Sequence, residues 1–319
     1  MTYKKKAAIL SSLLAVLIIV YILTFVLSPE NRRDKAFAWL ASEHLFMADK
    51  VEISGAGGRA VLSRINNVWF FTDQIGDLPV KQERVGDLFA LLSKKDIYPL
   101  RASSSEAIER LGVSEGSASR ITIRGGAGLP LLDLLLGSPD ALGEVYLRRA
   151  GWNQIYSSEN NYSEFTEAKP HSWYDLRLFP SAPAEMTTDK IQQAEIAVPG
   201  KEPFIIRRSG SGWILPGNES ASLENILVEA WLRSCLEAAA DDFSRQPPEA
   251  AGEGKLSFWF GDGTSRTLEA GRADEKNMRN ARVSGSSYNY LIGGRTYNML
   301  FRDMTYFLKS ESKELNRHL

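Results

Sequence analysis

Three histidines and one cysteine are the residues of this sequence that most readily support metal binding or nucleophilic catalysis. The histidines, His44, His171 and His318, lie far apart in the chain, and Cys235 has no second cysteine beside it. Structural zinc sites usually draw four such ligands from short, regular spacings. The sequence therefore predicts neither a metal site nor a bound cofactor.

Cys235 lies in an apolar, helix-like run that extends from Trp231 to Leu236. A reactive thiol needs a neighbouring group, such as histidine, that stabilises the thiolate, and none is close in sequence. We expect Cys235 to be a small buried side chain. A single cysteine also excludes an intramolecular disulfide, so the core alone must stabilise the fold.

The serines do not form a recognisable hydrolase motif. Residues 209–212 (Ser-Gly-Ser-Gly) fall between two expected strands and predict a hairpin turn, not a nucleophile elbow. Residues 310–313 have Ser-x-x-Lys spacing but lie in a polar tail, and Asp241-Asp242 follows an expected helix as a solvated end. We therefore predict that the protein is not an enzyme. A hydrolase stays the least favoured hypothesis: triads assemble in space, so sequence order alone does not exclude one, but no nucleophile elbow appears at an expected strand-to-helix turn.

Glycine-rich segments and overall charge exclude two further classes of protein. Residues 55–58 and 125–128 carry no Gly-Lys-Ser/Thr continuation and join strands, so they predict turns and not phosphate loops. Lys and Arg number 38 against 39 Asp and Glu, a net charge of -1. Nucleic-acid binders usually show a basic excess, so no nucleic-acid partner is expected.

Aromatic side chains are the remaining candidates for a site. Trp152, Tyr156, Trp173 and Tyr174 could line a face that binds a glycan or a peptide. The competing interpretation is packing, because aromatic residues on strands usually contact a neighbour within the sheet. An exposed sheet edge could also accept a strand from a partner.

The N-terminal segment 7–27 is uncharged and contains neither Gly nor Pro. As a helix it would be about 31 Å long, which matches a hydrocarbon core of about 30 Å. With lysines at positions 4–6, it predicts a cytoplasmic tail and transmembrane helix over residues 1–28 and an extracytoplasmic remainder. The predicted location is the bacterial inner membrane, with the bilayer as a partner; a cleaved signal peptide is the alternative.

Residues 29–46 are expected to form a juxtamembrane helix or linker. Phe37 and Trp39 could lie at the level of the lipid headgroups, or they could be the first core residues of the folded part.

In the rest of the chain, apolar and polar residues alternate as in β-hairpins, and a few helical segments interrupt them. Apolar residues follow a helical stripe over residues 81–95 and again over 221–239. Before, between and after these two stripes, short alternating runs are separated by turns such as Gly-Gly and Asp-Gly, which are typical of hairpins. The predicted class is α+β, with antiparallel sheets and one or two packed helices for each.

The same order of elements occurs twice. Aligning Trp69 with Trp213, at an offset of about 144 residues, superposes a strand, a turn, a Trp-containing strand and a helix. This indicates two similar β-rich units, which we place at residues 47–184 and 185–310, followed by a polar tail at 311–319. A length of 319 residues suits two modest domains.

Several local motifs resemble one known family. They are a helix over residues 85–100, Leu-Gly-Val at 111–113, a Gly-Ser-Pro turn within 134–139, the segment 145–157 (VYLRRAGWNQIYS) and the closing segment 172–180 (SWYDLRLFP). In these motifs the chain resembles the bacterial domain-of-unknown-function 4340 family over about residues 35–310. It departs from the family pattern in having Leu-Gly-Val where tyrosine-glycine-leucine is usual.

The resemblance implies an accessory protein of the bacterial envelope and carries no catalytic residue across. Relatives are often associated with ABC-transporter systems of the gliding-motility type, which implies a transporter permease or a related subunit as partner. We therefore expect a non-enzymatic, membrane-anchored interaction subunit. The alternative is an extracytoplasmic module that binds a glycan or a peptide.

Overall fold

The structure is a computed structural model of the whole chain. It describes Leu14 and residues 16–21, and then residues 36–179, 187–218, 221–249 and 253–309. His318, the tail 311–319 and the predicted boundary at 184/185 lie outside these ranges.

Of the predicted membrane span, residues 7–27, the structure describes only Leu14 and residues 16–21. Crossing a hydrocarbon core takes about 20 helical residues. Among the residues that the structure describes, no helix combines that length with enough apolar character. This finding contradicts the predicted single-pass localisation in the inner membrane, and that prediction is wrong.

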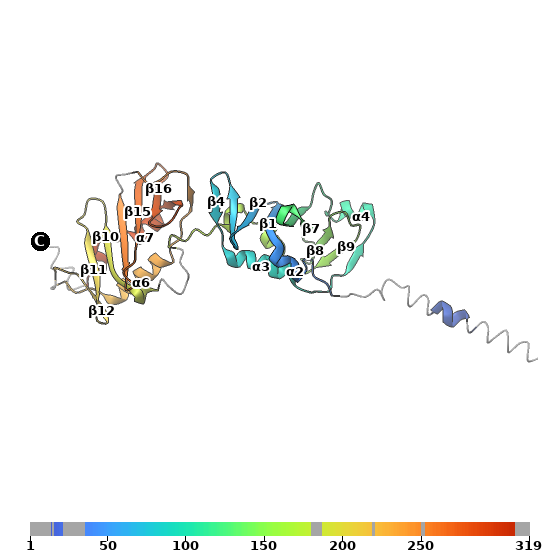
Figure 1. Cartoon of the computed structure of the whole chain (residues 1–319), viewed down its shortest axis with the longest axis horizontal. Coiled ribbons are helices and arrows are strands. Elements are labelled where there is room, and N and C mark those ends of the chain that lie inside the picture. Colours follow the sequence, from blue (N-terminus) through green and yellow to red (C-terminus); the bar gives the residue numbers. More distant parts are fainter. Residues whose placement is uncertain are drawn as a thin grey trace, which may run out of the picture. The chain divides into compact units, whose positions relative to one another are not determined.

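The described chain forms two compact units (Figure 1). The first unit comprises residues up to Arg64 together with Glu83–Lys169, and the second comprises Ile65–Gln82 together with residues from Pro170 onward. The expected class is confirmed, because the units contain antiparallel sheets and few helices. The predicted domain bounds at 47–184 and 185–310 stay a prediction.

Strands of the first unit follow the order β2-β1-β6-β7-β8-β9-β5. Their bounds are β1 (Ala48–Gly55), β2 (Gly58–Ile65), β5 (Leu100–Ala102), β6 (Ser119–Gly125), β7 (Pro130–Leu136), β8 (Val145–Arg149) and β9 (Ile155–Ser158). The α-helices are α2 (Ser42–Met47), α3 (Gln82–Ser93), α4 (Ser105–Arg110) and α5 (Ser163–Thr166). Val85, Leu88 and Leu92 form the buried stripe of α3, as the helical period requires.

Phe37 and Trp39 belong to the core of the first unit. Trp39 is 4% exposed, and its ring lies 5.2 Å from that of Tyr98 and 5.7 Å from that of Tyr156, between ring centroids. The Phe37 ring contacts the same three aromatic residues. Of the two interpretations of these residues, packing is the one that the structure shows.

The second unit contains a β-hairpin and an eight-stranded sheet. The hairpin pairs β3 (Val68–Asp73) with β4 (Gly76–Pro79). The sheet order is β12-β11-β10-β14-β15-β16-β17-β13. Its bounds are β10 (Ile191–Ala197), β11 (Phe204–Ser209), β12 (Gly212–Ile214), β13 (Asp242–Ser244), β14 (Gly254–Phe260), β15 (Ser265–Ala273), β16 (Met278–Val283) and β17 (Asn289–Gly293).

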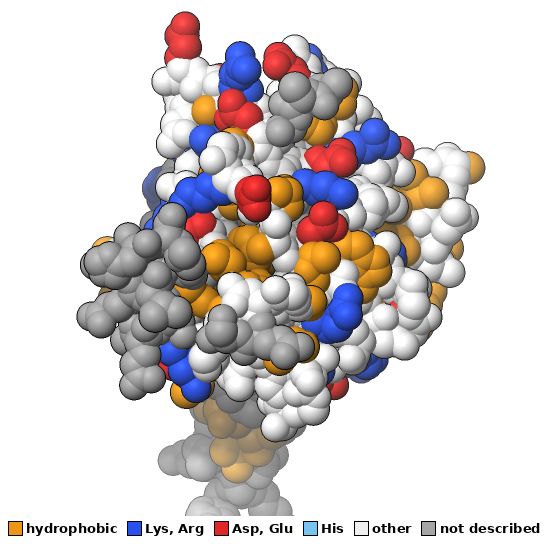
Figure 2. Space-filling model, turned by 90° about the vertical axis from the view of Figure 1, so that its left-hand side faces the viewer, with side chains coloured by type: hydrophobic (Ala, Val, Ile, Leu, Met, Phe, Trp, Pro, Cys, Tyr) orange, Lys and Arg blue, Asp and Glu red, His pale blue; other side chains and the backbone are white. Residues whose placement is uncertain are grey.

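Helices α6 (Asn225–Leu236), α7 (Gly294–Leu300) and α8 (Met304–Phe307) complete the second unit. Helix α6 contacts both α7 and α8 and buries Val228, Trp231, Leu232 and Cys235. Figure 2 shows the molecule from the left-hand side of Figure 1, where β11 and β12 are labelled. Hydrophobic side chains gather in a hollow on this face, with side chains of both charges around it.

The two sheets share strand order and local irregularities. Seven strands of the second unit, in the order β11-β10-β14-β15-β16-β17-β13, correspond one by one to the seven of the first. The pairing of β1 with β6 shifts its register between Ala48 and Lys50, and that of β10 with β14 shifts between Ile191 and Gln193. A β-bulge at the same place in two sheets is a specific feature that chain topology alone does not require.

A side-chain amide holds the Trp-containing strand in both halves of the sequence. The Trp69 N–H donates to Gln82 Oε1 at 3.0 Å, and Gln82 Nε2 donates to the Trp69 carbonyl at 2.8 Å. The Trp213 N–H likewise donates to Asn225 Oδ1 at 2.9 Å. Gln82 and Asn225 are each the first residue of their helix, so each amide ties a helix start to a strand.

We expect Gln82→Met to lower the free energy of unfolding by about 1–2 kcal/mol, because the side chain keeps its length but no longer bonds the Trp69 backbone. Urea titration followed by circular dichroism measures the change. Gln246→Met, at an exposed glutamine, is the matched control and should have little effect. Equal losses in both variants would contradict a specific role for the Gln82 amide.

Candidate functional site

Two of the four aromatic candidates lie in the first unit. Trp152 follows β8 in a turn and is 43% exposed, with the Arg149 guanidinium 5.4 Å from its ring centroid. Tyr156 is half-buried on β9 and packs against Phe37 and Trp39. Neither lines any of the pockets described below.

The other two candidates, Trp173 and Tyr174, lie in the second unit. Trp173 is fully buried, whereas Tyr174 is 8% exposed and its ring lies 4.9 Å from Phe71 and 5.5 Å from Phe243, between centroids. The structure therefore places two candidates in each unit, and Trp152 and Tyr156 contact different neighbours. Tyr174 belongs to an aromatic cluster that borders a pocket through Phe243.

That pocket is formed by the β3–β4 hairpin, the end of β13 and the start of β17, and it has a volume of about 450 Å³. We call it the edge groove. Its hairpin wall and its sheet wall together contain Gln74, Ile75, Asp77, Leu78, Phe243, Ser244, Arg245, Ser287, Tyr288 and Asn289. The volume lies within the usual range of ligand pockets, about 300–1,000 Å³.

Aromatic rings form a continuous layer at the edge groove. Phe243 is 6% exposed and lies 5.7 Å from Tyr288 and 5.5 Å from Tyr290, between ring centroids. Tyr174 extends the layer on its other side. Such tilted and edge-on contacts are the preferred geometries of aromatic pairs, so the layer is a rigid apolar surface.

Tyr174 and Tyr288 at this surface are neutral at physiological pH. Burial raises the pKa of Tyr174 to about 12, and the carboxylates of Asp73 and Asp242 add to the effect. Burial, and secondarily Asp77, raises the pKa of Tyr288. A neutral phenol keeps its proton for donation, and the Tyr288 hydroxyl donates to the backbone carbonyl of Asp77 at 3.0 Å.

The walls of the edge groove carry opposite charges. The Asp77 and Arg245 side chains are both exposed. Arg245 donates to Gln74 Oε1 at 3.2 Å, and Asp77 accepts a hydrogen bond from the Thr72 hydroxyl at 3.2 Å. Neither residue forms a described salt bridge, so one cationic and one anionic group are available to a ligand.

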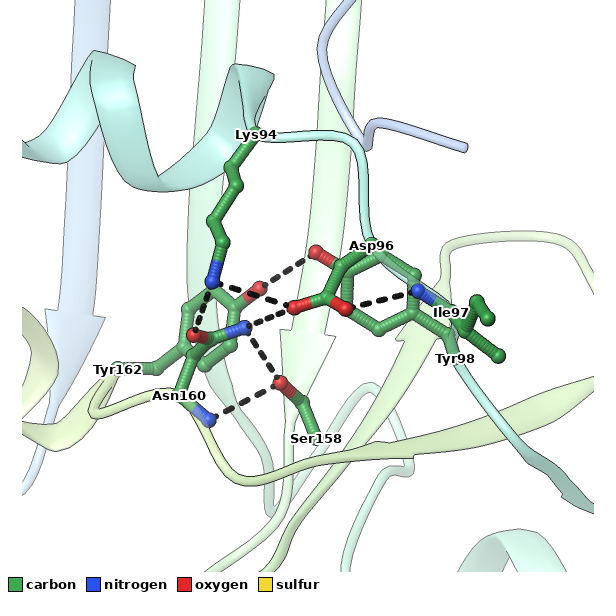
Figure 3. A network of polar contacts seen from close by, with 7 residues as sticks. All are labelled: Lys94, Asp96, Ile97, Tyr98, Ser158, Asn160 and Tyr162. Atoms are coloured by element: carbon green, nitrogen blue, oxygen red, sulfur yellow. Dashed lines mark hydrogen bonds and ion pairs between the residues drawn. The ribbon is translucent and has the colours of Figure 1, made fainter. Parts of the chain in front are cut away.

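A second pocket of about 450 Å³ lies in the first unit, between the segment after α3 and the end of β9. Figure 3 shows the polar network at this place, in which the Asn160 amide lies between Asp96 and Ser158. Asn160 Nδ2 donates to Asp96 Oδ2 at 3.3 Å and to Ser158 Oγ at 3.0 Å, while Lys94 lies 3.4 Å from Asp96. Behind it, the hydroxyls of Tyr98 and Tyr162 lie 3.4 Å apart.

The groups of this second pocket are compensated within the fold. The Asn160 amide and the Ile97 N–H lower the pKa of the Asp96 carboxyl, so it is ionised and paired with Lys94. Arg101 holds Glu144 through two hydrogen bonds, at 2.7 and 2.9 Å, and also donates to Ser157. We interpret this network as a structural link between the segment after α3 and the end of β9. Because its charged groups are already paired within the fold, the edge groove is the stronger candidate site.

Two of the residues considered for catalysis, Cys235 and His171, are not available as reactive groups. Cys235 is completely buried, and burial raises the pKa of its thiol well above the usual value. The ring of His171 bonds through Nε2 to the Asp241 carbonyl at 2.8 Å. His44 lies in α2 of the first unit, where its Nδ1 atom is buried without a hydrogen-bond partner among the described residues. Within the described ranges, no group of histidine, cysteine, aspartate and glutamate could hold a metal ion.

Sequence reasoning did not single out Asp77, Phe243 or Arg245. Tyr288 is one of eleven tyrosines in the chain, and Asp77 and Arg245 lie in short polar stretches of sequence like many others. They are identified by their common position on one pocket. There Arg245 contacts Gln74, which is 171 positions away in the chain, and Tyr288 contacts Asp77, which is 211 positions away. Local pattern does not contain that information.

Residues 69–255 match the family described as "Domain of unknown function (DUF4340)", which is more than half of the chain. The chain belongs to this family. No curated protein and no solved structure gives a significant match. The resemblance to the family is thus confirmed, and its association with ABC-type transport stays a prediction.

Proposed function

We propose that this protein is a non-enzymatic interaction subunit that holds a segment of a partner protein in the edge groove. The observation that carries the proposal is the combination, on one pocket, of an apolar aromatic surface and two exposed groups of opposite charge. Protein-binding sites commonly pair a buried aromatic anchor with a polar rim. Phe243 and Tyr288 supply the anchor surface here, and Asp77 and Arg245 supply the rim.

The nature of the candidate nucleophiles supports a non-enzymatic role. A fully buried cysteine with a raised thiol pKa is a poor nucleophile. His171 Nε2 is engaged by a backbone carbonyl and so is not free to act as a base on a neighbouring hydroxyl.

The partner that we propose is a subunit of an ABC-type transport or gliding-like system, as the family resemblance implies. The alternative is a peptide- or glycan-binding module without a fixed partner. The aromatic surface and paired charges of the edge groove favour a polypeptide, because they match the composition of protein interfaces.

We also propose that the two sheets arose by internal duplication of one α+β unit. The shared order of seven strands, the β-bulge at the same position in both sheets and the amide contacts of Trp69 and Trp213 support this proposal. The edge groove has no counterpart in the pocket of the first unit, which lies at the opposite ends of the corresponding strands. Duplication would then have been followed by specialisation of one copy.

Co-purification of the full chain from its native cells tests the proposed function. We expect one protein to be retained by the unaltered chain and lost with Arg245→Glu or Ile75→Asp, which change the charge and the apolar character of the edge groove. Lys276→Glu, in the exposed β15–β16 turn, is the matched control and should retain it. The proposal is overturned when the groove variants and the control recover the same proteins, or when the chain always emerges alone.

A further inference from the structure

Only one end of the outer edge of β4 pairs with another segment of the described chain. At its C-terminal end, residues 173–175 pair with it across the Val80–Tyr174 bridge: the Asp175 N–H donates to the Pro79 carbonyl at 2.9 Å, and the Lys81 N–H donates to the Trp173 carbonyl at 3.0 Å. These bonds show that the odd-numbered residues of β4 direct their backbone groups away from β3.

The pairing segment then leaves β4. Beyond Asp175, the chain turns to pair with residues 238–240, where the Ala240 N–H donates to the Leu176 carbonyl and the Leu178 N–H donates to the Ala238 carbonyl. The next outward residue of β4, counted in steps of two, is Asp77. The segment that pairs with Pro79 and Lys81 therefore does not continue to the position opposite Asp77.

A side chain takes the place of a strand at this position. The Tyr288 hydroxyl donates to the Asp77 carbonyl at 3.0 Å. By the same period of two, the Asp77 N–H points to the same side, so this residue presents both groups of a ladder hydrogen-bond pair. A phenol bond is replaceable, because it depends on one rotatable side chain and not on a continuous backbone.

From this geometry we infer that the partner segment enters the edge groove as an extended strand that pairs with Asp77 and displaces the Tyr288 hydroxyl. This inference rests on the proposed function and specifies the conformation and chemistry of its ligand. Backbone pairing supplies affinity in this mode of recognition, and alternate side chains supply specificity.

The side chains of the edge groove define the sequence that the strand should have. The ligand residue opposite Asp77 shares its face of the sheet, so a lysine or arginine there forms a cross-strand pair of opposite charge. The residues on either side share the face of Leu78, which is buried and lines the edge groove together with Phe243 and Tyr288. These flanking residues should be apolar, such as valine and phenylalanine.

A labelled synthetic peptide of about seven residues tests the inference, with a central lysine between valine and phenylalanine and threonine at the outer positions. Fluorescence polarisation with the full chain measures its affinity. N-methylation of the central lysine removes the N–H that would donate to Asp77, and we expect affinity to fall about tenfold or more. N-methylation of the adjacent residue, whose N–H points away from β4, is the matched control and should leave affinity nearly unchanged.

Two variants make the test independent of folding. Tyr288→Phe removes the competing hydroxyl and should tighten peptide binding by about threefold to tenfold, whereas Tyr306→Phe, away from the groove, should not change it. Asp77→Lys should weaken the lysine peptide and favour a peptide with central glutamate. Equal affinity of both N-methylated peptides would overturn strand addition, while a loss of binding with Arg245→Glu in the same assay would still support the interaction role. A series in which no peptide binds also overturns the inference.

Discussion

Replacing Trp231 by alanine is expected to lower the free energy of unfolding of the second unit by about 3–5 kcal/mol, the usual cost of truncating a buried tryptophan. Trp231 is 3% exposed and lies between α6 and the sheet, with its ring 6.1 Å from Phe258 and 5.1 Å from Phe307, between centroids. Its indole N–H donates to the Leu300 carbonyl at 3.1 Å, so alanine also removes the link from α6 to α7.

Hydrogen exchange at the amides of β14, combined with urea titration of the full chain, measures this loss in the second unit. Ile226→Ala is the matched control, because Ile226 lies on the same helix but is 76% exposed. We expect it to change stability by less than about 0.5 kcal/mol. Similar losses in the two variants would mean that α6 contributes through helix propensity and not through the packing of Trp231.

Gly57→Ala is expected to destabilise the first unit by about 1–3 kcal/mol through overpacking. Gly57 lies in the turn between β1 and β2, and a Cβ there would collide with the backbone oxygens of Glu167 and Ala168. Backbone oxygens cannot rotate away as a side chain can, so the turn or the segment after α5 has to move.

Gly86→Ala is expected to raise stability, the opposite of the effect expected at Gly57. Gly86 lies inside α3, and a Cβ there meets nothing within 4 Å. Alanine should therefore stabilise the helix by about 0.5–1 kcal/mol, because it removes the entropic cost of glycine. Urea titration of both variants checks the pair, and a stabilised Gly57→Ala protein would contradict the close packing of the β1–β2 turn.

The edge groove gives the family a concrete hypothesis of function. Its two walls come from different parts of the second unit, and Tyr288 closes the place where a strand could pair with Asp77. An unprotected sheet edge invites unwanted association, and natural proteins usually cover it. A removable tyrosine contact would protect the edge of β4 while keeping it available to a chosen partner.

Much of the fold could be predicted from the sequence, because the governing patterns are local. The apolar stripe over residues 81–95 predicted α3, which spans Gln82–Ser93, and that over 221–239 predicted α6, which spans Asn225–Leu236. Alternation and glycine turns likewise predicted most of the strands, and motifs such as Leu-Gly-Val at 111–113 and the segment 172–180 led to the correct family. Each of these signals lies within a few residues of chain.

The site and the fate of single aromatic residues were decided by the tertiary structure. Composition treats Trp152, Tyr156, Trp173 and Tyr174 alike, yet the first is half exposed and the third is fully buried, because burial depends on which strands pack over each ring. The predicted single-pass localisation in the inner membrane was wrong, because no described helix has the required length and apolar character.

By itself, then, the sequence determined the α+β class, the positions of the main helices and strands, and membership of the family. Only the tertiary structure decided where function could reside, because the edge groove joins Asp77 to Tyr288 across 211 positions of the chain. Short-range periodicity is set by the geometry of helices and strands, whereas a pocket depends on how distant segments pair.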